Sequence, residues 1–294
     1  KAVSQFDRWR KALRPKLVSF GKGDHPKELI HLVSESLLLT MQSVPILDPY
    51  AIYQHLMDYW AETMQDDCYL LSAEGWVAET CRVVETGKGG KTKDRGWTCD
   101  LVPKPLVVAR FFVKEQAEID ELRVKLETVS ASLAEFEEEH GSEGGLLFEA
   151  QDEKGGLTKG SVKARLVAAI EGGTDVAEPG EIPVLKKWLK LSTAETELKR
   201  SLRAAEAQLD LLAYEKYPQL SVKEIQTLVV DDKWLATLAA VVQCELDGVS
   251  QTLTGRIRQL ADRYATPLPE LEAEIAALAA KVEMHLKRME GARA

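Results

Sequence analysis

The sequence predicts a mainly α-helical protein, with long helices that include an antiparallel coiled-coil arm and a small two- or three-stranded antiparallel β element near residues 68–103. Three observations support this fold class. Apolar residues recur at spacings of three and four over most of the chain, which is the period of one helix face. Two separate segments carry heptad-like stripes, as a coiled coil requires. Short apolar runs bounded by Gly and Pro are confined to one region.

Composition sets the broad class of the protein. The chain has 294 residues, of which 45% are hydrophobic and 29% charged, and these proportions indicate a soluble globular protein of one large or two modest domains. No apolar run approaches the roughly 18 residues that a bilayer crossing needs, so we expect no membrane association. The four cysteines form no CxxC pair, which argues against a zinc site. Because the chain opens without Met inside an amphipathic stretch, we expect a fragment of a longer protein.

Residues 1–104 are expected to form a helical segment followed by a small β-hairpin region. Asp48 suits the N-cap of a helix, and Pro49 suits its first turn because proline has no N–H to satisfy. The apolar stripe that follows predicts a helix ending near Gln65. The runs 68–76, 81–87 and 96–103 are interpreted as strands, and the stretch 87–96 as a flexible, basic connector.

Residues 105–217 are expected to form the coiled-coil arm. One seam consists of Ile119, Leu122, Leu126, Val129, Leu133 and Phe136. The other consists of Leu191, Leu198, Leu202, Ala205, Leu209 and Leu212. A Gly-rich insert separates them, and we expect one short helix in it at 158–170. The first arm is strongly acidic, since residues 114–153 hold thirteen Asp or Glu against three Lys or Arg.

Residues 218–294 are expected to supply C-terminal helices for subunit assembly. A short helix and then a long helix are predicted up to Tyr264, and a last helix is predicted from Pro269. Their apolar stripes suit helix packing. The candidate partner interface consists of Leu253, Ile257, Leu260, Leu271, Ile275, Leu278, Val282 and Leu286.

A search for catalytic motifs finds none that the chemistry would need. The sequence has no GxGxxG, no phosphate-binding loop, no HExxH and no GxSxG. Asp58 and Glu62 share a helix face and could hold a divalent ion, but this spacing is common on any solvated helix. Aromatic residues near Trp60 could stack on a base, yet at helical spacing they favour packing. We therefore assign no catalytic, cofactor-binding or metal-binding residue in this chain.

Contact with DNA would need a local basic patch, because a net charge of −9 repels phosphate. The connector 87–96 supplies such a patch. Its candidate contacts to the DNA backbone are Lys88, Lys91, Lys93 and Arg95. The alternative interpretation is a solvated loop.

Several long stretches resemble one protein family. The segment "LDPYAIYQHLMDYWAETMQDDCYLL" (47–71) resembles the modification (M) subunit of type I restriction-modification enzymes. The stretches "DLVPKPLVVARFF" (100–112), "YPQLSVKEIQTLVVDDKWLATL" (217–238) and "SQTLTGRIRQLADRYATPLPELE" (250–272) are similar to later parts of that subunit, in the same order. The resemblance covers most of the chain.

The resemblance implies a parent that is a bacterial or archaeal cytoplasmic N6-adenine DNA methyltransferase using S-adenosylmethionine. It also implies a specificity (S) subunit, a restriction (R) subunit and a second M subunit as partners, with DNA bound through the complex. The family's Gly-rich cofactor motif and Asn-Pro-Pro-Phe/Tyr motif are absent here, and Pro49 in "DPY" does not replace the latter. We therefore expect a non-catalytic C-terminal part that binds no cofactor and is inactive alone.

Two alternatives remain open at this point. The chain could be a coiled-coil scaffold or interaction protein without a methyltransferase parent, which the heptads alone would permit. It could also catalyse methyl transfer by itself, against which the missing motifs argue.

Overall fold

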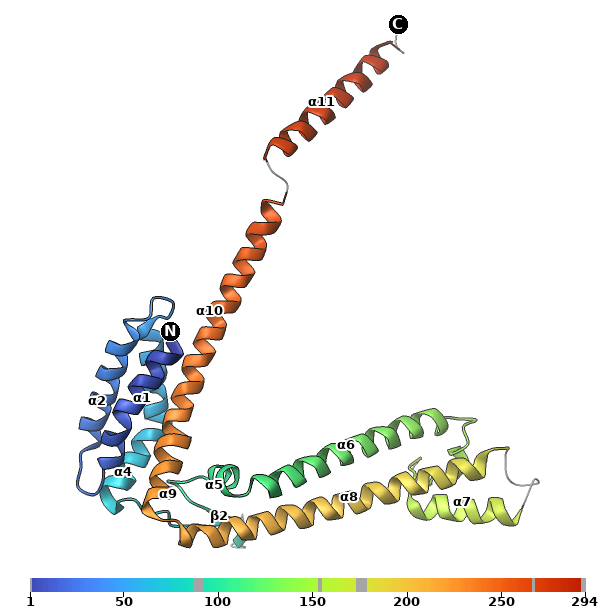
Figure 1. The fold of residues 1–294 in the computed structure, drawn as a ribbon. Helices are drawn as coiled ribbons and strands as arrows, with labels where there is room; N and C mark the ends of the chain where they lie inside the picture. The colour runs from blue at the N-terminus through green and yellow to red at the C-terminus, as the bar shows by residue number, and fades with distance from the viewer. Residues whose placement is uncertain (1, 87–91, 153–154, 173–178, 266–267, 292–294) are drawn as a thin grey trace. The chain divides into compact units, whose positions relative to one another are not determined.

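A computed structural model describes residues 2–86, 92–152, 155–172, 179–265 and 268–291 (Figure 1). The fold is mainly α-helical, and the described residues contain one two-stranded antiparallel sheet, so the predicted mainly helical fold with a small antiparallel β element is confirmed. The chain forms two compact units. The first contains residues 1–75 and 230–294, and the second contains residues 76–229.

This division differs from the three consecutive segments expected, with boundaries at 104 and 217. Residues from both ends of the chain share the first unit because contacts distant in sequence join them. Arg14, for example, forms a two-pronged ion pair with Asp231, with Nη2 2.7 Å from Oδ2 and Nε 2.8 Å from Oδ1. A pair of residues this far apart in the chain gives no local sequence signal for where a domain begins or ends.

Among its described residues, the first unit contains helices and connecting loops but no strand. In chain order it holds α1 (Ala2–Ser19), α2 (Pro26–Met41), α3 (Pro49–Tyr59), the π-helix η1 (Trp60–Met64), α4 (Gln65–Glu74), α10 (Ala236–Arg263) and α11 (Leu268–Gly291). The π-helix η5 (Thr227–Leu235) spans the boundary between the units in the chain. Helix α2 packs against α1, α3 and α4, and the proximal part of α10 packs against α1 and α3.

The start of α3 follows the prediction, and the end of this helical stretch does not. Asp48 is the N-cap and accepts a hydrogen bond from the Tyr50 N–H at 2.9 Å, with Pro49 in the first turn. The predicted end near Gln65 is wrong, since η1 and α4 continue the helical path to Glu74. Gly75 ends it, with a φ of 82° that favours glycine.

The predicted strand at 68–76 is therefore wrong in its main part. Its apolar residues are helical, and Cys68 and Leu71 are fully buried on α4. A short apolar run has the same appearance in a buried helix and in a buried strand, so periodicity alone could not decide between them.

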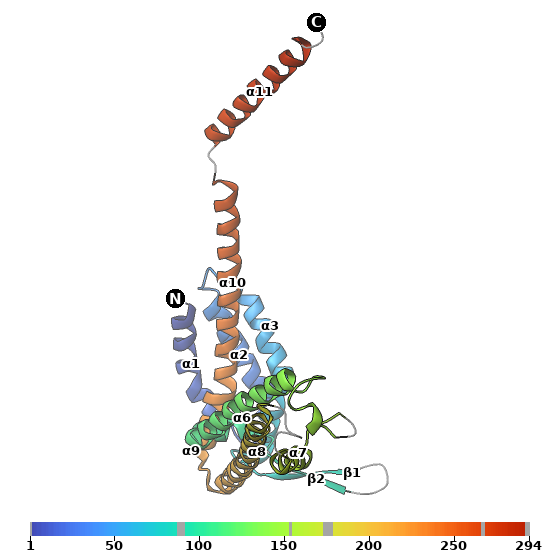
Figure 2. The ribbon, with the colours of Figure 1, turned by 90° about the vertical axis from the view of Figure 1, so that its right-hand side faces the viewer.

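The second unit contains the hairpin and the arm. Its elements are β1 (Cys81–Thr86), β2 (Thr92–Thr98), α5 (Lys104–Phe111), α6 (Val113–His140), the 3-10 helix η2 (Phe148–Ala150), α7 (Lys159–Glu171), α8 (Glu181–Lys216), the 3-10 helix η4 (Tyr217–Gln219) and α9 (Val222–Gln226). The strands pair antiparallel, with Cys81 opposite Thr98 and Thr86 opposite Thr92. Figure 2 shows the two strands side by side and α7 next to α8.

Helices α6 and α8 form an antiparallel pair (Figure 1). Polar contacts show its direction: Arg123 pairs with Glu206 at 2.7 Å, Ser130 donates to Glu195 at 2.8 Å, and the Trp188 indole donates to Glu137 at 2.7 Å. Partner numbers fall on α8 as they rise on α6. The antiparallel arm is thus present as a helix pair, and supercoiling of the two helices stays a prediction.

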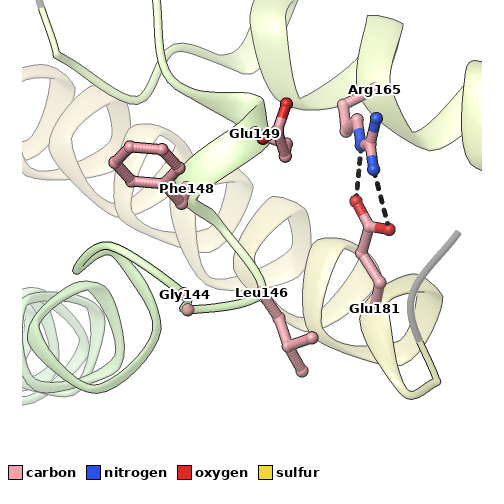
Figure 3. A pocket seen from close by; sticks show the side chains of 7 residues that line it. Gly144, Leu146, Phe148, Glu149, Arg165 and Glu181 are labelled. Carbon is pink, nitrogen blue, oxygen red and sulfur yellow. Dashed lines mark hydrogen bonds and ion pairs between the residues drawn. The ribbon is translucent and has the colours of Figure 1, made fainter.

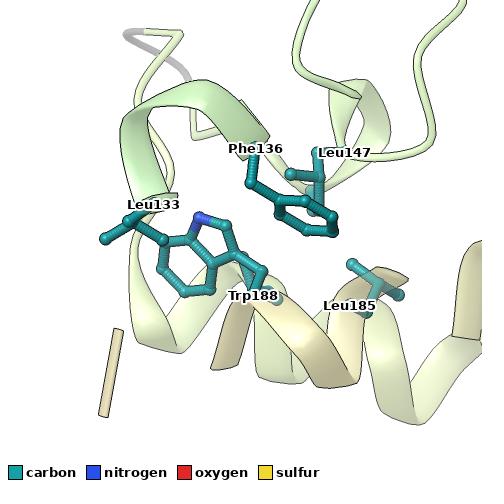
Figure 4. Close-up of a cluster of buried hydrophobic side chains, with 7 residues drawn as sticks. Leu133, Phe136, Leu147, Leu185 and Trp188 are labelled. Atoms are coloured by element: carbon teal, nitrogen blue, oxygen red, sulfur yellow. The ribbon is translucent and has the colours of Figure 1, made fainter. Parts of the chain in front are cut away.

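The tip of the arm has its own hydrophobic core. Side chains from α6, α7, α8 and the insert meet there, and Figure 4 shows the indole of Trp188 beside Leu133, with Phe136 between Leu147 and Leu185. The buried cluster consists of Leu133, Phe136, Leu147, Ala150, Val162, Leu185 and Trp188. The predicted helix at 158–170 is confirmed as α7, which starts with a capping box between Thr158 and Ser161.

The base of the arm is joined to the hairpin by aromatic and polar contacts. The Trp97 indole of β2 donates to Asp210 of α8 at 3.1 Å, and Lys104 pairs with the same carboxylate. The Tyr217 hydroxyl donates to the backbone carbonyl of Val102 at 2.7 Å. Burial raises the pKa of Tyr217, so this hydroxyl remains protonated and keeps donating at neutral pH.

Candidate partner interface

Helix α10 has two halves with opposite surroundings. Its start is buried: Leu238 and Val242 are 3% and 2% exposed. A polar contact from α3 reinforces this half, with His55 Nε2 2.9 Å from Glu245 Oε1. From Gln251 to its end at Arg263, every residue of α10 is exposed. The proximal half is therefore part of a core, and the distal half is covered by no described residue.

The distal half of α10 nevertheless carries an apolar stripe. Leu253, Ile257 and Leu260 follow one another at spacings of four and three, which places them on one helix face. Their exposed fractions are 55%, 65% and 39%. A helix that remains in water usually carries polar residues at such positions, so this stripe is typical of a surface that another helix covers.

Helix α11 repeats the pattern over its whole length. Every residue from Leu268 to Met289 is exposed, although six apolar side chains share one face. These are Leu271, Ile275, Leu278, Val282, Leu286 and Met289. All eight residues predicted as a partner interface are thus helical and exposed. They are available for contact, and their role as a partner interface stays a prediction.

The other predicted site residues give a different result. Lys88 and Lys91 lie outside the described residues. Lys93 and Arg95 belong to strand β2. Their side chains are outside the described part of the structure. Contact of these basic residues with the DNA backbone stays a prediction.

The helical stretch from Asp48 to Asp67 contains no acid–base or metal arrangement among its described residues. Asp58 is exposed and accepts a hydrogen bond from Gln54 one turn earlier, at 2.8 Å. Glu62 and Asp66 are also exposed. No group of three or more His, Cys, Asp or Glu side chains is positioned to hold a metal ion in the described part of the chain. Trp60 is 8% exposed, in agreement with the predicted packing role.

One polar cluster of this stretch was not predicted. Asp67 is buried, and its Oδ1 accepts from Lys233 Nζ at 2.7 Å while its Oδ2 accepts from the Trp234 indole at 2.8 Å. The sequence signal would have been a lysine directly before the apolar Trp234 and Leu235, but nothing local points to its partner. Burial raises the pKa of Tyr59 to about 12, so its hydroxyl stays protonated and can donate to the Lys233 carbonyl, 3.4 Å away. Through Tyr59 and Asp67, this cluster connects α3 and α4 to η5.

A cavity of about 210 Å³ lies at the tip of the arm (Figure 3). It is lined by Gly144, Gly145, Leu146, Phe148, Glu149, Arg165 and Glu181. The Arg165 guanidinium donates to both carboxylate oxygens of Glu181, at 2.6 and 3.1 Å, and Glu181 is only 2% exposed. Arg165 and Glu181, two of the three charged side chains that line the cavity, are therefore paired with each other and join α7 to the start of α8.

Comparison of the chain with protein-family models, with curated proteins and with solved structures gives no match. In the described part of the chain, no helix is both long enough and apolar enough to cross a bilayer. The most prominent surface feature of the described residues is the exposed apolar face of α10 and α11.

Proposed function

We propose that this chain is the non-catalytic C-terminal part of the modification subunit of a type I restriction-modification enzyme, an N6-adenine DNA methyltransferase. Its role is assembly: the distal half of α10 and the whole of α11 pack on helices of the specificity subunit. DNA methylation itself would depend on a catalytic domain elsewhere in the parent subunit, with S-adenosylmethionine bound there.

One observation carries this proposal. Two successive helices expose regular apolar faces, formed by Leu253, Ile257 and Leu260 on α10 and by the six-residue face of α11. Burying an apolar side chain of this size stabilises a complex by about 1.5–3 kcal/mol, less the cost of association. Several such residues in a row suffice for a stable subunit interface. The resemblance of residues 47–71 and 217–272 to the M subunit indicates which partner this is.

The test is binding of the purified S subunit to the 294-residue chain. We expect that Ile257→Asp combined with Leu278→Asp weakens binding at least 100-fold, because each charge would enter an apolar contact. Ala280→Asp, on the opposite face of α11, is the matched control and should bind as the unaltered chain does. Failure of the unaltered chain to bind S would refute the assembly role.

A scaffold without a methyltransferase parent is the second candidate. The antiparallel pair of α6 and α8 favours it, since such arms commonly serve as spacers. The gene sequence upstream of Lys1 separates the two. A Gly-rich motif and Asn-Pro-Pro-Phe or Asn-Pro-Pro-Tyr there would support the methyltransferase parent, and their absence would support the scaffold.

A further inference from the structure

Charge is divided between the helices of the arm. Helix α6 carries nine Asp or Glu against three Lys or Arg. Residues 159–171 of α7 and 181–203 of α8 together carry nine Lys or Arg against four Glu. On a chain with a net charge of −9, a surplus of five positive charges in these two segments is a local exception. Figure 1 shows α6 and α7 on different sides of α8, against which both helices pack.

Two contacts determine how α7 lies on α8. Lys159 Nζ donates to Thr196 Oγ1 at 2.5 Å, and the Arg165 guanidinium donates to Glu181. Because the partner numbers fall on α8 as they rise on α7, the two helices are antiparallel. At about 100° per residue, Lys159 lies roughly 60° to one side of the buried Val162, and Arg165 lies roughly 60° to the other. The two contacts are therefore at opposite edges of the α7–α8 packing.

The edge marked by Thr196 faces away from α6. Around α8, Thr196 and Lys186 lie about 20° and about 100° to one side of the buried Leu185. Trp188 and Glu195, which bond to residues of α6, lie about 60° and about 80° to the other side. A side chain on the Lys186 side of α8 is thus directed away from the acidic helix.

Basic residues of both helices gather on this side. A residue one turn further along a helix keeps the same side, so Lys163 follows Lys159 on α7 and Lys190 follows Lys186 on α8. The set, called the basic row below, consists of Lys159 and Lys163 of α7 and Lys186, Lys190 and Arg200 of α8. All five are exposed except Lys159, which is half-buried. The row therefore crosses from one helix to the other on a single surface.

The four Glu of these segments do not cancel the basic row. Glu181 and Glu195 each form an ion pair with a basic residue outside the row, on the α6 side of α8. Glu171 ends α7 on the side that faces away from α8. Only Glu197 lies within the row. Five positive charges against one negative charge leave this surface strongly basic.

The basic row has the composition and length of a phosphate-binding surface. Lys186 and Arg200 are 14 residues apart, so the row is about 21 Å long, or roughly two-thirds of one DNA turn. Thr193 is exposed between them on the same side, and hydroxyls also donate to phosphate oxygens. The row holds no aromatic residue on which the bases of a single strand would stack. A stiff duplex therefore fits it better than a single strand.

We propose that the basic row binds the phosphate backbone of double-stranded DNA without reading its sequence. Each basic side chain contributes a salt-sensitive contact. An acidic protein segment is the rival ligand, but Val167 and Ile170, which are exposed beside the row on α7, are not the aromatic anchors typical of protein interfaces. The inference goes beyond the proposed function, in which the arm has no assigned role, and it holds equally for a scaffold.

Fluorescence anisotropy of the full 294-residue chain with a labelled DNA duplex of about 20 base pairs tests the proposal. At about 50 mM salt we expect binding whose logarithm falls with the logarithm of salt at a slope of about −4, as four or five phosphate contacts predict. Lys163→Gln combined with Lys190→Gln should weaken binding about tenfold and reduce the slope by about two. Glu197→Gln should tighten binding, and duplexes of unrelated sequence should bind alike.

The matched control is Lys114→Gln combined with Lys125→Gln, at two exposed positions of α6. It removes the same charge from the acidic helix and should leave binding unchanged. Equal losses in both double variants would show an effect of net charge alone and overturn the proposal. No binding at about 100 μM chain in about 50 mM salt would also overturn it, as would tighter binding of a poly-glutamate peptide of equal charge. Binding to S tests only the proposed function, so the two can fail separately.

Discussion

Lys233 and Asp67 form an ion pair at 2.7 Å although they are 166 positions apart in sequence, and their side chains are only 10% and 4% exposed. The Trp234 indole donates to the second oxygen of the same carboxylate. Burial opposes ionisation of Asp67 and raises its pKa, while Lys233 and Trp234 act in the opposite direction. The pair connects the N-terminal helices to the start of the C-terminal helical run within one unit.

Removing one member of this pair should destabilise the first unit strongly. We expect Asp67→Ala to lower the free energy of unfolding by about 3–5 kcal/mol, because the Lys233 charge would stay buried without its carboxylate. The double variant Asp67→Leu, Lys233→Met should lose much less, since neither charge remains. Urea unfolding followed by circular dichroism measures both, with the exposed neighbour change Asp66→Ala as a control. Equal losses in the single and double variants would contradict this account.

The start of α9 should contribute a pH dependence to stability. The Ser221 backbone N–H and hydroxyl both donate to Glu224, which lowers the pKa of that carboxyl below its ordinary 4.5, and Lys216 adds to the effect. In the unfolded chain the carboxyl binds its proton more readily. The stabilisation is therefore complete above about pH 4.5 and is lost as the pH falls through the lower folded pKa.

Glu224→Gln should flatten this dependence. The amide oxygen can still accept from Ser221, but it does not titrate. Because the carboxyl is largely solvated, we expect only about 0.5 kcal/mol of difference between pH 5 and pH 2. Thermal unfolding over this pH range measures it, with Glu215→Gln at a carboxyl in the preceding helix as the matched control. Parallel pH curves for Glu224→Gln and the original chain would exclude the effect.

The four cysteines should divide into two reactivity classes. Cys81 and Cys244 are exposed, while Cys68 and Cys99 are buried. Burial raises the pKa of both buried thiols, which further reduces the reactive thiolate. Titration with a disulfide reagent should label two thiols in the folded chain at least tenfold faster than the other two, and all four at once in denaturant. Four equal labelling rates in the folded chain would show that Cys68 and Cys99 are not buried in solution.

The tip of the arm should depend on Trp188. Its side chain is 2% exposed within a core shared by α6 and α8, so Trp188→Ala should cost about 3–5 kcal/mol through loss of packing. Because Trp188 belongs to the second unit, the loss should appear in hydrogen exchange of α6 and α7 and leave α1 and α2 unchanged. Uniform loss of protection in both units would show that they unfold together. Val167→Ala, at an exposed position of α7, is the control.

Local chemistry determined several elements from the sequence alone. Asp48 and Pro49 predicted the start of α3, since a capping carboxylate and a proline act within one helical turn. The heptad seam from Ile119 to Phe136 predicted the face of α6 that packs on α8, because the period of a helix fixes which side chains share a face. The last helix and its apolar face were predicted in the same way.

Tertiary structure alone decided the remainder, because it depends on contacts between residues far apart in the chain. The run around Cys68 and Leu71 could have been a strand or a helix until its packing was known. The partner of Lys233 is 166 residues away, at a distance where sequence carries no sign of proximity. Periodicity predicted an apolar face on both ends of α10, but only the fold shows that Leu238 is buried and that Ile257 is exposed.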